Sequence, residues 1–141
     1  MPLSPRLALL GLPWDRSSSF EYGAAAAPPH IRRALWSPST NTATEVGIAI
    51  EPETLDDRGD LTLPDDPAAA RRVIEAGVAG LLADGCVPLL LGGDHSVTYP
   101  ILRAFGARRP ATVLHIDAHG DLYDEFPAFA RDGDSMRLRQ V

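Results

Sequence analysis

Hydrophobic residues in this chain gather in three short, uninterrupted runs, a pattern typical of strands that are buried on both faces. The runs are LALLGL at 7–12, VPLLLG at 87–92 and ATVLHI at 111–116. A weaker run, VGIAI, occupies 46–50. We therefore expect parallel strands at the three strong runs, and we assign a further strand to the weaker one.

Helical periodicity fills the intervals between these runs. In the segment 66–85, Asp66 suits the cap, Pro67 the first helical position and Gly85 the stop. The apolar side chains that share one face of this expected helix are Ile74, Val78, Leu81 and Leu82. The spacing predicts a helix that packs this face on the sheet.

Two further helices are expected, one through SVTYPILRAF at 96–105 and one beginning at PPHIRRALW at 28–36. Pro100 is tolerable in the former only near its start. Strands that alternate with helices in this way predict βαβ units. The expected fold class is therefore α/β, a three-layer sandwich with a mainly parallel sheet, in a single domain over 1–141.

The remaining segments carry weaker signals. Residues 37–66 are mostly polar and predict loops, with RGD at 58–60 as a turn. The final MRLRQV at 136–141 resembles the beginning of another strand. A sheet that stopped there would have an exposed edge, so we expect an incomplete sheet and a possible homo-oligomer.

Composition narrows the class of protein. The chain has 141 residues and a net charge of −6, which argues against a nucleic-acid partner. No apolar run approaches the roughly 18 residues of a membrane helix, and no secretory signal is evident. The single cysteine, Cys86, excludes an internal disulfide framework and suits a small buried side chain. We expect a cytoplasmic protein that does not enter a membrane.

Metal-capable side chains follow two of the expected strands. GGDHS places His95 just beyond one run, and DAHGD places Asp117, His119 and Asp121 beyond another. In an extended loop, residues at i, i+2 and i+4 point the same way, so the last three can converge with His95. Carboxylate oxygen and imidazole nitrogen without thiolate suit Mn²⁺, Zn²⁺ or Fe²⁺. The sequence therefore predicts a metal site where the strands end.

Other readings of these residues are weaker. GGDHS lacks the lysine and the glycine spacing of a phosphate-binding loop. Asp94, His95 and Ser96 are neighbours in sequence and cannot form a catalytic triad among themselves, so Asp94 is expected to orient a ligand. His115 lies inside an apolar run, where a hydrogen-bonded core histidine is the simpler prediction.

The pair GGDHS and DAHGD resembles the manganese-dependent ureohydrolases, and DLYDEF at 121–126 is similar to their agmatinase-like branch. The resemblance implies that His95 and Asp121 hold one Mn²⁺ and His119 a second, with Asp117 bridging both. It also implies hydrolysis of an agmatine-like guanidino compound to urea and an amine. No catalytic residue is assigned beyond these ligands.

The chain departs from that family in two places. A later DxDxxDP motif, which supplies two more aspartate ligands, is absent, and so is a Ser-His segment after DLYDEF. The chain is therefore expected to be the amino-terminal part of such an enzyme or a shortened member. Because its carboxylates offset only part of the charge of two divalent ions, we expect one ion at most and little hydrolysis. The alternatives are a non-catalytic metal-binding relative and a mononuclear hydrolase of another C–N bond.

Overall fold

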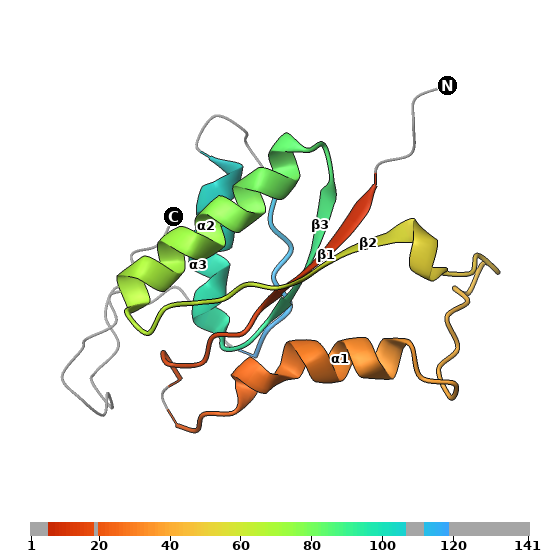
Figure 1. The fold of residues 1–141 in the computed structure, drawn as a ribbon, viewed down its shortest axis with the longest axis horizontal. Helices are drawn as coiled ribbons and strands as arrows, with labels where there is room; N and C mark the ends of the chain where they lie inside the picture. The colour runs from red at the N-terminus through yellow and green to blue at the C-terminus, as the bar shows by residue number, and fades with distance from the viewer. Residues whose placement is uncertain (1–5, 19, 107–111, 119–141) are drawn as a thin grey trace.

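Parallel strands form the centre of the protein in a computed structural model that describes residues 6–18, 20–106 and 112–118 (Figure 1). The sheet has three strands in the order β2-β1-β3. They are β1 (Leu7–Leu12), β2 (Leu55–Asp60) and β3 (Val87–Gly92). β1 pairs in parallel with both neighbours, with Leu7 opposite Leu55 on one side and opposite Val87 on the other.

Helices cover both faces of this sheet (Figure 1). They are α1 (Ala27–Leu35), α2 (Pro67–Ala83) and α3 (Thr98–Phe105). α1 lies on one face, and α2 and α3 pack together on the other (Figure 1). Single 3-10 turns occupy Ala24–Ala26, Pro52–Thr54 and His95–Val97. The predicted α/β class with three layers and a parallel sheet is confirmed, as a partial sandwich.

The ends of α2 follow from its local sequence. An oxygen of Asp66 accepts a hydrogen bond from the amide of Ala69 at 2.7 Å, which satisfies a donor that the first turn leaves without a helical partner. Pro67 begins the helix, where its missing N–H costs nothing. Gly85 has a φ of 73°, the left-handed conformation that commonly ends a helix. The predicted cap, start and stop are confirmed.

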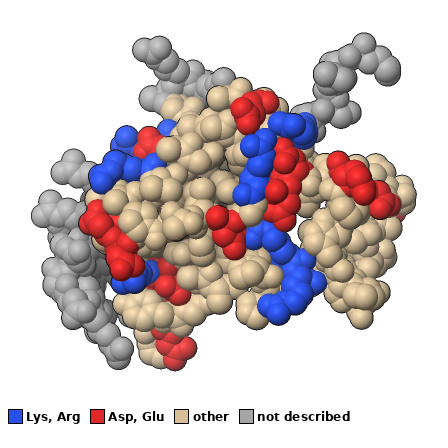
Figure 2. Space-filling view, viewed as in Figure 1, with Lys and Arg blue, Asp and Glu red and all other residues tan. Residues whose placement is uncertain are grey.

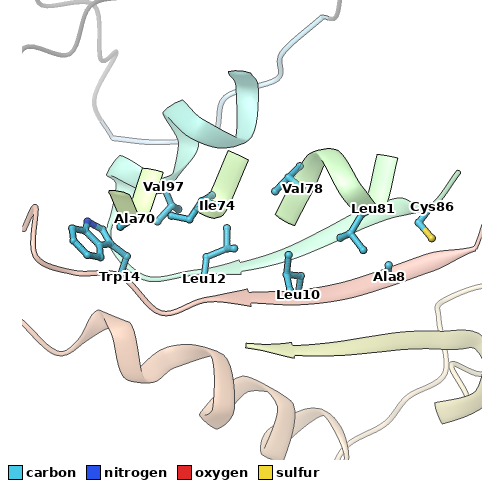
Figure 3. Packing of buried hydrophobic residues seen from close by; sticks show 10 residues of the cluster. All are labelled: Ala8, Leu10, Leu12, Trp14, Ala70, Ile74, Val78, Leu81, Cys86 and Val97. Atoms are coloured by element: carbon cyan, nitrogen blue, oxygen red, sulfur yellow. The ribbon is translucent and has the colours of Figure 1, made fainter. Parts of the chain in front are cut away.

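The main core lies between β1 and the α2–α3 layer (Figure 3). Alternate residues of β1 and the apolar face of α2 are buried against each other, together with Trp14, Cys86 and Val97 (Figure 3). The buried members from β1 and α2 are Ala8, Leu10, Leu12, Ala70, Ile74, Val78 and Leu81. Cys86 is 5% exposed, as expected of a small buried side chain.

The opposite face of β1 packs closely on α1. A Cβ added at Gly11 would lie 1.7 Å from a carboxylate oxygen of Asp60 and 3.0 Å from the Cβ of Pro28, which is buried at the start of α1. Leu9, two residues earlier on the same face, is 1% exposed. The missing side chain of Gly11 therefore lets α1 and the end of β2 approach the centre of the sheet.

The strand β2 corrects two predictions, since LDDRGD was expected to be loop and its RGD a turn. Of its six residues only Leu55 is buried. The guanidinium of Arg32, from α1, pairs with Asp57 at 3.0 Å and with Asp60, and donates to the carbonyl oxygen of Gly59 at 2.6 Å. Burial lowers the pKa of Arg32, but the two carboxylates outweigh it and raise that pKa. The ion pairs with Arg32 of α1 therefore stabilise this polar segment as an edge strand.

Charged side chains of both signs lie next to one another on the face drawn in Figure 2. One group of ion pairs joins β2 to the end of α2. A carboxylate oxygen of Asp56 lies 2.9 Å from a guanidinium nitrogen of Arg58 and 3.5 Å from one of Arg6. The same nitrogen of Arg58 lies 3.4 Å from a carboxylate oxygen of Asp84. A hydrogen bond from Arg58, aided by the charges of Arg58 and Arg6, holds the pKa of Asp56 below its usual value.

This lowered pKa predicts how stability depends on acid. Because the folded pKa lies below the unfolded value of about 3.9, the Asp56 contribution is present above that value and is lost as the pH falls through the folded pKa. Asp56→Asn should therefore flatten the fall in unfolding free energy on acidification below about pH 4. Urea unfolding between neutral and acidic pH measures this, with Glu45→Gln as the control for net charge. Equal acid dependence in Asp56→Asn and wild type would contradict it.

Two predicted strands do not form. VGIAI belongs to a turn in which Thr44 and Ile48 share a backbone hydrogen bond of 2.8 Å, and Val46 is 80% exposed. Residues 112–116 of ATVLHI have no strand structure, and Ile116 is 88% exposed. An apolar run provides strand propensity, but a strand also needs a neighbouring strand for its backbone hydrogen bonds. Residues 46–50 have only the isolated bridge between Ala43 and Ala49, and residues 112–116 pair with no strand among the described residues. The MRLRQV segment lies outside the described residues.

Candidate metal centre

The carboxyl ends of β1 and β3 form a switch point of the sheet. These strands are neighbours, but the chain leaves β1 toward α1 on one face and leaves β3 toward α3 on the other (Figure 1). The chain therefore continues toward opposite faces of the sheet after these two strands. In open α/β sheets, ligands bind at such a switch point.

The two loops touch through their backbones. The amide of Asp94 donates to the carbonyl oxygen of Trp14 at 2.7 Å. A Cβ added at Gly93 would lie 1.9 Å from that same oxygen, so only glycine permits this approach. The side chain of Trp14 is buried in the core, and its Nε1 donates to Ser17 Oγ at 3.1 Å. These contacts hold the two loops together beyond the strand ends.

The carboxylate of Asp94 fastens the loops further. One oxygen accepts from the amide of Ser17 at 2.9 Å. The other accepts from the amide of Ser96 at 3.0 Å and from its hydroxyl at 2.6 Å. This bonding caps the 3-10 turn His95–Val97, whose last residue is buried in the core. Asp94 therefore holds the backbone that carries His95, in line with the orienting role expected of it.

A second aspartate, which the sequence reasoning missed, anchors the loop after β1. One oxygen of Asp15 accepts from the amides of Gly23 and Ala25, at 2.6 Å and 3.1 Å. These bonds join the end of β1 to the turn that leads into α1. The position of Asp15 in the sequence could have indicated this role, because Asp15 follows the first apolar run much as Asp94 follows another.

Three metal-capable side chains lie close to one another. His95, His115 and Asp117 each offer one donor atom, and these atoms all lie within 4.8 Å of one another. Nε2 of His115 is 3.6 Å from an oxygen of Asp117. The rings of His95 and His115 stack with centroids 5.5 Å apart and planes 9° apart. The structure thus brings together His95 and Asp117, the two predicted ligands among the described residues.

His115 corrects a prediction, because it was expected to be a core histidine and is exposed instead. The segment around it is not part of the sheet, so its side chain is not covered. The signal that could have found it was the alternation that selected Asp117, since His115 precedes that residue by two positions. His119 and Asp121 continue the same alternation but lie outside the described residues.

The chemistry of the described donors fits a divalent transition metal. Two imidazoles and a carboxylate, without thiolate, suit Mn²⁺, Fe²⁺ or Zn²⁺. The hydroxyl of Thr98 lies 3.5 Å from Nδ1 of His95, close enough to favour one ring orientation.

No helix in the described parts of the chain is long and apolar enough to cross a membrane.

The protein has a three-layer α/β fold, and imidazole and carboxylate donors lie together at one end of its sheet. It is therefore an α/β protein with a candidate metal centre. The profile of the Arginase family matches residues 5–140. The chain therefore belongs to the arginase family, as its two motifs predicted.

Individual relatives agree with this assignment. Arginase 2, chloroplastic/mitochondrial, of Arabidopsis thaliana is 41% identical, in an alignment that covers 95% of this chain and 45% of the relative. The crystal structure of agmatine ureohydrolase of Thermoplasma volcanium matches with a TM-score of 0.67 and 26% identity, over 87% of this chain and 41% of that one. The structure of Trypanosoma cruzi formiminoglutamase with Mn²⁺ matches with a TM-score of 0.61 and 25% identity, over 72% and 35%. The chain spans less than half the length of the curated relatives it matches.

Proposed function

We propose that this chain provides metal ligands of an arginase-family hydrolase that converts a guanidino compound to urea and an amine. The observation that carries the proposal is the meeting of His95 and Asp117 at the switch point beyond β1 and β3. These two residues come from loops 22 positions apart and were both selected as ligands from sequence motifs. Family membership supports the reaction class.

The proposed ligands are His95, Asp117, His119 and Asp121, and the proposed metal is Mn²⁺. The donor chemistry of the first two and the Mn²⁺ of the Trypanosoma cruzi relative support this choice. When bound, the metal would supply Lewis-acid activation of the hydrolytic reaction. The chain's own contribution is positional, because Asp94 and Gly93 fix the loop that presents His95.

The finer assignment, an agmatine-like substrate, depends on DLYDEF at 121–126, which lies outside the described residues. An arginase and an agmatine ureohydrolase are both similar to the chain, so both substrates need testing. A cytoplasmic location and a homo-oligomer also remain predictions. The exposed apolar side chains of β3, with Leu89 at 48%, favour self-association.

The second candidate function is a non-catalytic metal-binding member of the same family. Among the described residues the metal-capable group contains a single carboxylate, Asp117, which offsets little of the charge of two divalent ions. We therefore expect the chain to hold one ion at most.

Metal counting and a urea assay on the same purified chain test both candidates. Mass spectrometry of the metal-loaded chain should give one Mn²⁺ per chain and no second ion. Urea release should be measured with agmatine and with arginine in the presence of Mn²⁺, and we expect little or none. Ready hydrolysis of one substrate would favour the enzyme over the non-catalytic candidate. Two tightly bound Mn²⁺ ions would overturn the single-ion proposal, and no bound metal would overturn both candidates.

A further inference from the structure

We infer that His115 is itself a metal ligand, so that His95, His115 and Asp117 hold one divalent ion together. The inference rests on the proposed function, because it needs the site at His95 and Asp117 to bind a metal, but it adds a donor that the family resemblance does not assign. The observation behind it is that the three donor atoms lie within 4.8 Å of one another.

The distances place His115 close to a ligand position. Donor atoms that share a transition metal at bonds of 2.0–2.2 Å are about 3.0–3.5 Å apart. The 3.6 Å between Nε2 of His115 and the oxygen of Asp117 nearly meets this spacing. The donor atom of His95 lies within 4.8 Å of the other two, so it needs to move by roughly 1 Å at most to reach this spacing.

Exposure allows this closure. A metal lies near the plane of each imidazole that binds it, whereas the two rings here are parallel, with 9° between their planes. One ring must therefore turn as the ion enters. The side chain of His115 is 39% exposed, so solvent reaches the ring and an ion can approach it. The backbone of His95 is held by Asp94, which makes His115 the part that adjusts.

The donor set also indicates which metals gain from His115. Imidazole suits Zn²⁺ and Fe²⁺, whereas carboxylate and water suit Mn²⁺. An added histidine should therefore raise the affinity for Zn²⁺ more than the affinity for Mn²⁺. The ratio of the two affinities becomes a measure of whether His115 is bound to the ion.

The decisive variant is His115→Phe, which keeps a flat ring against His95 but removes both nitrogen donors. Titration calorimetry should show Mn²⁺ binding weakened about 10-fold or more, and Zn²⁺ binding weakened further. Electron spin echo spectroscopy of the Mn²⁺-loaded chain should show one fewer coordinated imidazole nitrogen than in wild type. His115→Asp, which restores a donor without a ring, should recover most of the Mn²⁺ affinity but not the Zn²⁺ affinity.

The matched control is His30→Phe, which removes an exposed imidazole that contacts Arg33 on α1 and should leave both affinities unchanged. Thermal unfolding of each variant checks that it folds. If wild type binds Mn²⁺ and His115→Phe binds it equally, with the same number of imidazole nitrogens, the inference is overturned while the proposed function stands. If wild type binds neither Mn²⁺ nor Zn²⁺, the proposed function fails first.

Discussion

Gly93→Ala should destabilise the protein by about 3 kcal/mol, at the upper end of the cost of overpacking. The added methyl group would lie 1.9 Å from the carbonyl oxygen of Trp14 and 2.7 Å from its carbonyl carbon. Both are backbone atoms of β1's loop and cannot rotate aside. The two loops must separate, which breaks the 2.7 Å hydrogen bond from the amide of Asp94. Urea unfolding measures the loss as a lower midpoint at an unchanged slope.

The matched control for this prediction is Gly80→Ala in the middle of α2. A Cβ at Gly80 meets no atom within 4 Å, so alanine should stabilise the helix by about 0.5–1 kcal/mol. Opposite signs at the two glycines would show that the contact with Trp14, and not glycine flexibility, decides the result. Gly93→Ala should also bind Mn²⁺ more weakly, because the loop that carries His95 moves. A variant as stable as wild type would show that the loops do not meet as described.

Asp94→Ala is expected to destabilise the protein by about 2–3 kcal/mol and to weaken Mn²⁺ binding about 10–100-fold. The carboxylate accepts from the Ser17 amide, the Ser96 amide and the Ser96 hydroxyl, at 2.9, 3.0 and 2.6 Å. Its removal leaves both amides without this acceptor and frees the turn that presents His95. Chemical unfolding and Mn²⁺ titration calorimetry report the two effects separately.

Ser96→Ala serves as the comparison for Asp94→Ala. It removes the hydroxyl donor but leaves the two amide bonds to the carboxylate in place. Its effects on stability and on Mn²⁺ affinity should therefore be less than half as large. Equal effects in the two variants would mean that the serine hydroxyl, and not the bridge between loops, orients His95.

The elements with strong local signals were predicted with their boundaries. The runs at Leu7–Leu12 and Val87–Gly92 became β1 and β3. β1 is buried between the helix layers, as its apolar residues on both faces predict, whereas β3 lies at the edge of the described sheet and exposes Val87 and Leu89. α2 begins at Pro67 because a capping aspartate precedes that residue, and it ends before Gly85. Each of these signals acts within a few residues, so the sequence alone contains it.

The strand β2 and the segment 112–116 were predicted wrongly for complementary reasons. β2 is polar and is stabilised by Arg32, which lies 25 positions before Asp57 and comes from another layer. Residues 112–116 are mostly apolar, but they pair with no strand among the described residues. Strand formation depends on pairing with distant segments, and local hydrophobicity does not report that pairing.

For the site, the sequence by itself determined which donors are present and that His95 and Asp117 follow apolar runs. Only the tertiary structure decided that Asp94 bridges to Ser17, 77 positions away, and that His115 stacks on His95. The physical reason is that donor chemistry belongs to single side chains, whereas their convergence depends on how β1 and β3 pair and how the chain continues beyond them. A sequence motif names the candidate donors, and only the folded chain shows which of them lie close together.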